Sequence, residues 1–518
     1  MMKKYIIASI IALVCIPAAR AQVKEVAHPS GLELNKAGAL WFHTDNAAGM
    51  AVTPLADYNQ LSLSYNMEEG KYKLQQQGDS KGDLTVNTNG ALTLGKTRLW
   101  GDFTFTNTTL RNTRFNSILL DPVYDMPYYV ADPNTSWWKI QTYDMSVKAA
   151  TPFLWDRIAL GVSINYFSKA GAKQIDPRTT SYKYGISVIP SLVVKLAANH
   201  MLGLSGTYSN VFERTVPINS DSQQDQSVYL MKGLGNWSTA VVGSINGLKT
   251  FYYKQNLVGG ALQYGYHGNF HILAEGKYNY RVTDVIQTPS KPQMMGTTVR
   301  NSYGGNVQAL FGDEYTSKIY ADAYVNHTDG IEYVQELDDT YEVQQWVTIA
   351  KFIRSRYEFT AASLGYDFFA GKDNGYDWKI GVKGIYSNRE DEYILPHSAF
   401  SAENLYGELN GAKTFTNQTC VILLKANLGY NYNLGGEFLY NGADANSQVV
   451  KLMYERDLAV MTANYLMAGL GVNASFPISG KVAMYLGAEA QYLRNVTEAS
   501  RIQAPRRVFA GLTLGFNF

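Results

Sequence analysis

The 518-residue sequence has few charged residues, almost no cysteine and only one long apolar run. Charged residues make up 17% of the chain and the formal net charge is +1, whereas an average soluble domain has about 25% charged residues. This near balance excludes a nucleic-acid binder that works through bulk charge, and also an acidic disordered chain. The mean hydropathy is −0.19. Apolar runs of about 20 residues are absent beyond the N-terminus, which excludes a polytopic helical membrane protein.

The single apolar run lies at the N-terminus and has the layout of a secretory signal peptide. Two lysines precede the apolar stretch 5–19, and a small-residue cleavage site ends at Ala21. We predict that residues 1–21 are a signal peptide and that the mature chain begins at Gln22, with an uncleaved anchor helix as the alternative. Cleavage leaves Cys420 as the one cysteine, so the exported chain forms no intrachain disulfide.

Tyrosine and glycine are abundant, with 38 and 45 residues, and from about residue 58 onward apolar and polar residues alternate. A period of two is typical of β-strands. The clearest example is the terminal stretch, in which one face carries Val508, Ala510, Leu512, Leu514, Phe516 and Phe518. Such a face points at a core in a soluble sandwich but at lipid in a transmembrane barrel. Strands of about 10 to 16 residues, alternating short and long connections and aromatic strand ends favour the barrel.

The pattern therefore predicts an all-β fold, a transmembrane antiparallel β-barrel over residues 58–518. We expect about 18 strands, with 16 as the nearest even alternative. Short turns would lie on the periplasmic side and longer loops outside, for example near 215–256 and 329–345. Residues 22–57 lack clean alternation, and we expect a segment near the periplasmic mouth or a plug inside the lumen. The alternative is a strand-like tail that pairs with the first or last barrel strand.

Motifs that would carry chemistry are weak in this sequence. Residues 90–97 fit the P-loop consensus, but they alternate like a strand and no helix pattern follows them. His267 and His271 flank a Gly-Asn turn and form an incomplete metal site, and the acids of 329–342 fit no calcium loop. We therefore expect no catalytic, cofactor or metal site and no enzymatic activity.

Charged side chains fall on the polar faces of the predicted strands and supply the candidate functional residues. Their mixed signs indicate a hydrogen-bonded interior rather than a selectivity ring of one sign. The residues predicted to face the lumen are Asp102, Asp144, Lys148, Arg157, Glu275, Lys277, Arg281, Lys318, Asp322, Lys379, Lys383, Lys425 and Glu489. In the N-terminal segment, Asn46, Gly49 and Met50 are the gating candidates.

Several stretches of the chain resemble DUF6850, an outer-membrane β-barrel family of Bacteroidetes whose function is undefined. They are TRLWGDFTFTN (97–107), DPVYDMPYYVADP (121–133), YDMSVKAA (143–150) and IDPRTTSY (175–182). The resemblance covers most of the mature chain and implies the fold and the location, but no catalytic or binding residues. Thr179 departs from the Asp-Pro-Arg-Pro that is associated with the family, which weakens any inference of a site there.

Two further features, residues 46–50 and Phe518, are interpreted through a resemblance to known outer-membrane proteins. NAAGM (46–50) is similar to a stretch in the N-terminal hatch of FadL-type transporters of hydrophobic compounds, with Ala47 in place of a proline. The similarity to outer-membrane barrels also implies that the terminal aromatic residue, Phe518, is the signal that the barrel-insertion machinery recognises.

Together these observations predict a protein of the Gram-negative outer membrane that contacts outer-membrane lipid and the insertion machinery and binds no nucleic acid. We expect a channel or transporter for a small uncharged or amphipathic solute, gated by residues 22–57. The first alternative is a barrel that transports nothing and serves as partner or scaffold in a surface assembly, with the aromatic loop 112–138 as its contact surface. An outer-membrane enzyme is the second alternative. The sequence does not identify a protein partner at the cell surface or in the periplasm.

Overall fold

The computed structural model describes most of the chain. The described residues are 29–120, 126–221, 223–242, 250–288, 291–312, 315–340, 342, 344–371, 375–417, 419–479, 482–497 and 506–518. The predicted signal peptide and residues 22–28 lie outside them.

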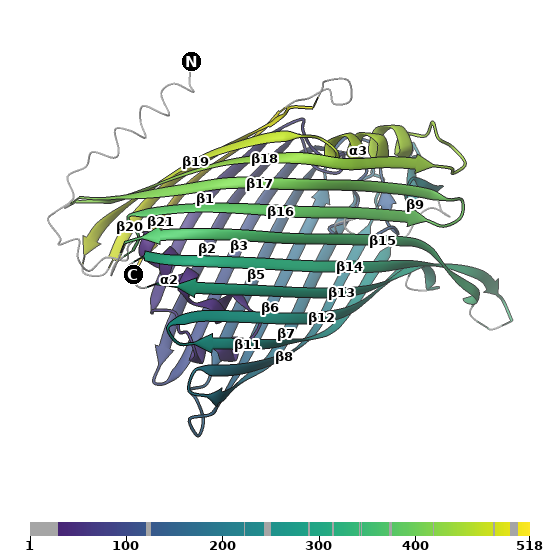
Figure 1. The fold of residues 1–518 in the computed structure, drawn as a ribbon. Helices are drawn as coiled ribbons and strands as arrows, with labels where there is room; N and C mark the ends of the chain where they lie inside the picture. Colours follow the sequence, from purple (N-terminus) through teal and green to yellow (C-terminus); the bar gives the residue numbers. More distant parts are fainter. Residues whose placement is uncertain are drawn as a thin grey trace, which may run out of the picture.

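Eighteen antiparallel strands form one closed barrel (Figure 1). Each barrel strand pairs with the next one along the chain, and β1 pairs with both β2 and β21, which closes the wall. The predicted fold class is therefore confirmed, with 18 strands rather than 16. The barrel strands are β1 (Tyr58–Gly70), β2 (Ser80–Leu94), β3 (Thr97–Thr113), β5 (Ser136–Ala150), β6 (Ile158–Lys173), β7 (Thr180–Ala197), β8 (His200–Val216), β11 (Phe251–His267), β12 (Phe270–Gln287), β13 (Gln293–Phe311), β14 (Tyr315–Asp338), β15 (Gln345–Ala370), β16 (Trp378–Tyr393), β17 (Ser398–Thr416), β18 (Val421–Tyr440), β19 (Tyr465–Ser479), β20 (Val482–Asn495) and β21 (Arg506–Asn517).

The outer face of the barrel carries its large apolar side chains. At the closing seam Leu63 pairs with Leu514 and Tyr65 with Leu512, and all four side chains are exposed. An apolar surface that surrounds a whole barrel is stable in hydrocarbon and not in water. The alternation of the sequence thus places one face of each strand against lipid and the other against the lumen.

Charged side chains mark the end of the apolar belt on β14, β15 and β16. His327 Nδ1 lies 3.0 Å from Glu358 Oε1, and Arg356 lies 3.7 Å from Asp329 and 3.8 Å from Glu392. Beyond this level β14 and β15 continue as a paired hairpin, because acidic residues do not interrupt an antiparallel ladder in water. The prediction of a loop at 329–345 is therefore wrong for all but its tip.

Two sets of segments lie within the barrel or across its mouth. The first precedes β1 and contains α2 (Pro29–Gly38), η2 (Leu40–His43) and η3 (Ala47–Ala51); we call residues 29–57 the plug. The second comprises the described residues of 114–135, 217–250 and 441–464, which we call the cap. The cap contains β4 (Val130–Ala131), β9 (Gln226–Gly233), β10 (Asn236–Val242), η4 (Val449–Tyr454) and α3 (Glu455–Met461). In the part of the chain that is described, none of the helices is long and apolar enough to cross a bilayer.

Removal of Phe518 is expected to impair assembly of the barrel. Its backbone N–H donates to Asn59 O at 3.0 Å and its carbonyl accepts from Asn59 N at 2.9 Å, so the residue extends the seam between β21 and β1 while its ring remains exposed. We expect deletion of Phe518 to lower the amount of heat-modifiable barrel in the outer membrane. Phe518→Ala keeps the backbone bonds and isolates the role of the ring. Normal insertion of both variants would contradict a role of this residue in assembly.

Candidate functional site: the lumen between plug and cap

The plug packs against the inner wall of the barrel through a small apolar cluster. Leu40, Trp41 and Ala48 contact inward side chains of β6, β7, β8 and β12. Glycines make room for this contact, since a Cβ added at Gly203 or at Gly265 would lie 2.8 Å from the Trp41 ring. The wall is thus shaped to receive the plug.

Asn46 joins the plug to a buried polar chain in the wall. Its Nδ2 donates to Leu192 O at 3.0 Å and to Gln263 Oε1 at 2.9 Å. Gln263 Nε2 in turn donates to Glu275 Oε2 at 2.9 Å. Because a buried amide without partners is costly, this chain fixes the position of the plug.

Lysines of the wall hold the main chain of the plug. Lys148 Nζ donates to Phe42 O and to Thr44 O, each at 2.9 Å. Lys318 Nζ donates to Ala37 O at 3.1 Å, near the C-terminal end of α2, where a cation is favoured by the helix dipole.

The acidic end of the plug contacts the opposite part of the wall. Glu33 forms an ion pair with Lys425 and accepts a 2.6 Å hydrogen bond from Tyr376 OH. The plug is therefore held at both ends by polar contacts, which water can replace more readily than the ladder hydrogen bonds between strands.

A cavity of about 560 Å³ lies between the plug and the wall. Its lining includes four basic side chains, Lys36, Lys318, Lys379 and Lys425, and three acidic ones, Glu33, Asp322 and Asp367. The nearly balanced charges leave no strong field of one sign in this part of the lumen.

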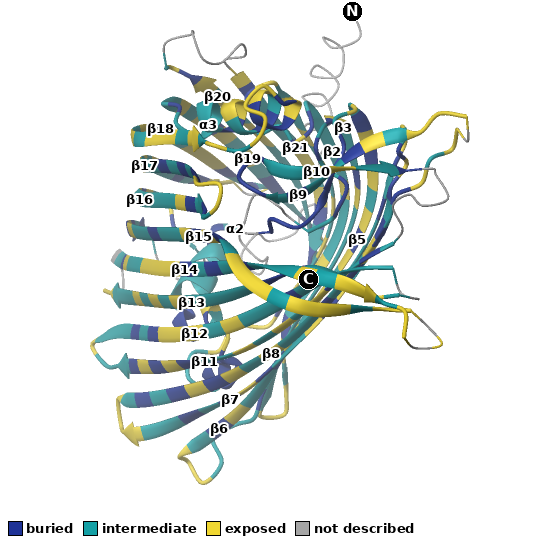
Figure 2. Ribbon diagram, turned by 90° about the vertical axis from the view of Figure 1, so that its right-hand side faces the viewer, coloured by how far each residue is buried: buried dark blue, intermediate teal, exposed yellow. Residues whose placement is uncertain are grey.

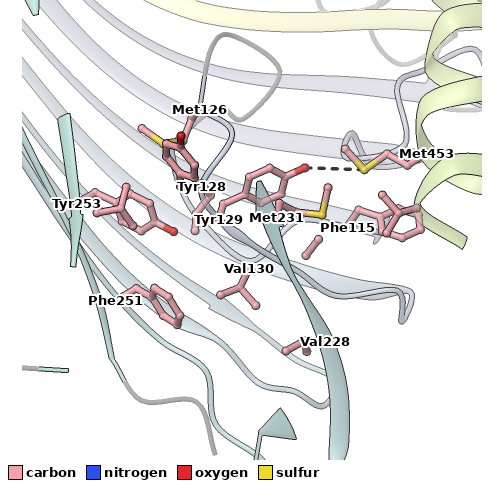
Figure 3. Close-up of a cluster of buried hydrophobic side chains, with 14 of the residues drawn as sticks. Phe115, Met126, Tyr128, Tyr129, Val130, Val228, Met231, Phe251, Tyr253 and Met453 are labelled. Carbon is pink, nitrogen blue, oxygen red and sulfur yellow. Dashed lines mark hydrogen bonds between the residues drawn. The ribbon is translucent and has the colours of Figure 1, made fainter. Parts of the chain in front are cut away.

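The cap closes part of the opposite mouth and has an apolar core of its own. Tyr128, Tyr129, Met231 and Met453 come from the cap, and Tyr253 comes from the wall (Figure 3). The hydroxyl of Tyr129 donates to the sulfur of Met453 at 3.8 Å. The aromatic loop predicted at 112–138 thus turns inward over much of its described length, where Tyr128 and Tyr129 are buried, whereas Trp137 is exposed.

Buried charges attach the cap to the wall. Asp132 forms an ion pair with Lys173, and both side chains are almost fully buried. Glu213 of β8 accepts hydrogen bonds from Leu119 N at 2.6 Å and from Ser181 Oγ at 2.7 Å. Because separation would leave a buried charge without its partner, these contacts hold the cap tightly.

A second cavity, of about 440 Å³, lies beneath α3 on the cap side of the lumen. Aromatic side chains line it together with groups that can form hydrogen bonds. The lining includes Tyr72, Tyr357, Phe359, Tyr465, Arg300, Arg389, Asn326, Asn404 and Asn431. Concave sites with apolar walls and a few polar groups are the usual form of small-molecule sites.

The raised pKa of the buried Asp457 carboxyl predicts that attachment of the cap depends on pH. Burial raises its pKa to about 7, although the backbone N–H of Gln75, with Arg389 and Lys73 nearby, favours the charged form. In an opened cap the pKa returns to its ordinary value of 3.8. At a pH between 3.8 and about 7, Asp457 is therefore protonated in the closed cap and ionised in the opened cap. Closure is therefore most stable at acid pH and weakens as the pH rises to about 7.

We therefore expect hydrogen exchange of 449–461, corrected for intrinsic rates, to be roughly 10- to 100-fold more protected at pH 5 than at pH 8. Asp457→Asn should remove this dependence, because the amide carries no charge at either pH. Equal pH dependence in the wild type and the variant would show that another group is responsible.

The structure places most of the predicted lumen residues on inward strand positions. Lys148, Lys318 and Lys425 contact the plug directly, and Glu275 does so through Gln263. The others are distributed along the wall. Asp102 accepts a hydrogen bond from Asn87 Nδ2, and Asp322 accepts one from Ser363 Oγ. Lys379 lies 3.5 Å from Asp367, and Glu489 lines a cavity of about 230 Å³. The remaining residues lie on β5, β12 and β16: Asp144, Lys277, Arg281 and Lys383.

Arg157 does not lie on a strand. It belongs to the tight turn between Leu154 and Ile158 and is exposed, because Trp155 and Asp156 adopt positive φ and reverse the chain there. The inward placement predicted for Arg157 is thus wrong.

The gating candidates are buried in the plug. Gly49 is required by close packing, since a Cβ there would lie 2.5 Å from the Trp41 ring. Met50 packs in a cluster with Ala47 and Ala150 of β5. Sequence reasoning missed Trp41, Gln263 and the Asp132–Lys173 pair, because no local pattern links residues that meet only across the barrel.

The fold and the lumen define a transmembrane β-barrel of the outer-membrane type, closed by 18 strands and occupied by a plug and a cap. The sequence matches the model of DUF6850, described as a family of unknown function, over residues 47–518. The chain belongs to this family.

Solved structures that resemble this chain are also barrels. BauA, the ferric preacinetobactin receptor from Acinetobacter baumannii, is 8% identical with a TM-score of 0.40, over 89% of this chain and 80% of that one. The outer membrane transporter YddB from Escherichia coli is 7% identical with a TM-score of 0.41, over 89% and 81%. The copper transporter OprC is 9% identical with a TM-score of 0.41, over 89% and 80%. At these values the similarity carries no argument about cargo.

No curated protein matches the sequence. The similarity of residues 46–50 to FadL-type transporters is not shown and stays a prediction.

Proposed function

We propose that this protein is an outer-membrane channel or transporter for a small uncharged or amphipathic solute, and that the plug gates its lumen. The observation that carries the proposal is the way in which the plug is held. Lys148, Lys318 and Lys425 bind it through exchangeable polar contacts, whereas the wall is a continuous hydrogen-bonded ladder. Asn46 and Trp41 also attach the plug to the wall, but the plug contributes no strand to the barrel. It can therefore move or leave without loss of the barrel.

The chemistry of the two cavities supports the proposed solute class. The plug-side cavity has nearly balanced charge, so neither anions nor cations gain a large advantage there. The cap-side cavity combines aromatic faces with amide and guanidinium groups, which suits a solute with both apolar and hydrogen-bonding surfaces.

The surroundings of the barrel follow from the same proposal. Its apolar belt would contact outer-membrane lipid, and the barrel-insertion machinery would recognise its terminal strand. Cleavage near Ala21-Gln22 would leave the plug at the start of the mature chain.

Swelling of proteoliposomes in solutes of matched size tests the proposed selectivity. We expect a neutral sugar to enter at least as fast as anionic and cationic analogues, and the rates to differ by less than about tenfold because the lumen has no single-sign ring. Deletion of residues 22–57 should raise all three rates. Exclusion of the neutral solute by a protein that passes ions would overturn the proposed solute class.

A further inference from the structure

The hairpin formed by the far halves of β14 and β15 has no counterpart elsewhere in the described barrel. β13 pairs with β14 only as far as Ile331, and β16 pairs with β15 only from Ser355 onward. Beyond these points the two strands pair with each other alone, up to Asp338 and Gln345. We call residues 332–354 the arm. Figure 1 shows the arm extending past the other strands, and Figure 2 shows it passing across the mouth of the barrel.

The arm lies outside the hydrocarbon layer. β14 has 24 residues, whereas about 9 to 11 residues suffice for a tilted strand to cross a bilayer. The charged contacts of His327, Asp329 and Arg356 precede the arm on the outer face. Side chains of the arm are therefore exposed to water and not to lipid.

Large apolar side chains are nevertheless exposed along the arm. They lie on both strands: Val334 (48% exposed), Leu337 (39%), Val347 (45%), Ile349 (64%), Phe352 (49%) and Ile353 (42%). An apolar surface of this kind in water marks a contact with another molecule. A ribbon of two strands is also only marginally stable by itself.

The edges of the arm provide a second sign of a missing partner. In the described chain, residues 332–338 and 345–353 each have one edge without a neighbouring strand. At the base of the arm, Ile394 N donates to Arg354 O at 2.8 Å and Tyr393 OH donates to Glu332 Oε1 at 2.7 Å. Such edges are templates for an added strand. At the tip, Lys291 Nζ contacts Gln344 Oε1 at 2.6 Å, which is a side-chain contact and leaves the edges open.

The charge of the arm selects among possible occupants. The arm has five acidic residues and two basic ones, Lys351 and Arg354, which lie near its base. Its outer part, residues 334–349, has four acidic residues, Glu336, Asp338, Asp339 and Glu342, and no basic one. The arm of a second copy would bring like charges together, which is unfavourable. A segment that alternates apolar with basic residues complements both the side chains and the charge.

We propose that the arm is a docking surface for a second protein outside the cell, which adds an extended strand of alternating apolar and Lys or Arg residues to an edge of the arm. Because the arm crosses the mouth, the partner would lie over the entrance to the lumen. This proposal is independent of whether the lumen conducts solute.

A peptide of nine residues that alternates Val with Lys and Thr is the direct probe, with the full protein in nanodiscs and binding followed by fluorescence anisotropy. We expect binding to weaken at least tenfold when Glu replaces Lys in the peptide, and when alternate amides are N-methylated to block strand addition. The variant Val334→Ser/Ile349→Ser/Phe352→Ser should lose binding, whereas Gln335→Ser/Thr348→Ser should retain it. Equal binding of the basic, acidic and N-methylated peptides would overturn the proposal.

Photo-crosslinking from position 349 in intact cells distinguishes the occupants. The proposal expects a product whose mapped site is a basic, apolar-alternating segment of another protein. Its yield should fall in the variant Glu336→Gln/Asp338→Asn/Asp339→Asn/Glu342→Gln. A product formed only between two copies of this chain, or no product above that from Leu409 on the lipid face, would overturn it.

Discussion

Oxidation of the variant Ala48→Cys/Ser191→Cys is expected to abolish solute uptake, and a reductant should restore it. The backbone N–H of Ala48 in the plug donates to Ser191 Oγ of β7 at 3.3 Å, so the two residues are in direct contact and are the pair chosen for a disulfide. A covalent link would hold the plug against the wall and prevent the movement that transport requires. Uptake by the same protein before and after reduction gives the comparison.

The natural cysteine must be removed for this experiment. Cys420 is free and only partly buried, so Cys420→Ser serves as the background for the double variant. Each single cysteine variant is the matched control and should be insensitive to oxidant. Unchanged uptake by a fully oxidised double variant would mean that solute passes without displacement of the plug at η3.

Leu424→Arg is expected to destabilise the barrel far more than Lys425→Leu, although the two residues are adjacent. Leu424 is the fourth residue of β18 (Val421–Tyr440) and its side chain is exposed on the outer face. An Arg there costs up to about 4 kcal/mol in lipid, and the cost falls toward the interface. Lys425 points inward to Glu33. This ion pair is substantially exposed, so its loss should cost less than about 1 kcal/mol.

Urea unfolding in lipid vesicles measures both free energies of unfolding. Leu424→Ala provides the control for loss of side-chain volume without a charge. Equal destabilisation by Leu424→Arg and Lys425→Leu would show that the assignment of inner and outer faces on β18 is wrong.

The barrel was predictable because each strand has one face in contact with lipid and the other in contact with water. Leu424 and Lys425 must face opposite sides of a wall with lipid outside and water inside, so the alternation of the sequence reports the fold directly. The arm was not predictable, because its acids resemble those of a loop. Outside the bilayer nothing requires strands to stop, and Glu336 and Asp338 are compatible with a paired strand in water.

The candidate site was predictable only in part, and for a similar reason. Parity identifies Lys148 as inward, but it does not reveal that this lysine binds the carbonyl of Phe42, 106 residues away. The contact of Asn46 with Gln263 spans 217 residues. Such contacts depend on the curvature of the closed wall, which no local pattern encodes.

The central claim, a solute path closed by the plug, is tested most directly by single-channel recording of the chain without residues 22–57. The variant keeps its signal segment and all 18 strands, so insertion should proceed at a near-normal level. Our account predicts stable open channels for this variant in planar bilayers and a much lower conductance for the wild type. A deletion variant that inserts, shows heat-modifiable folding and remains closed would contradict the claim.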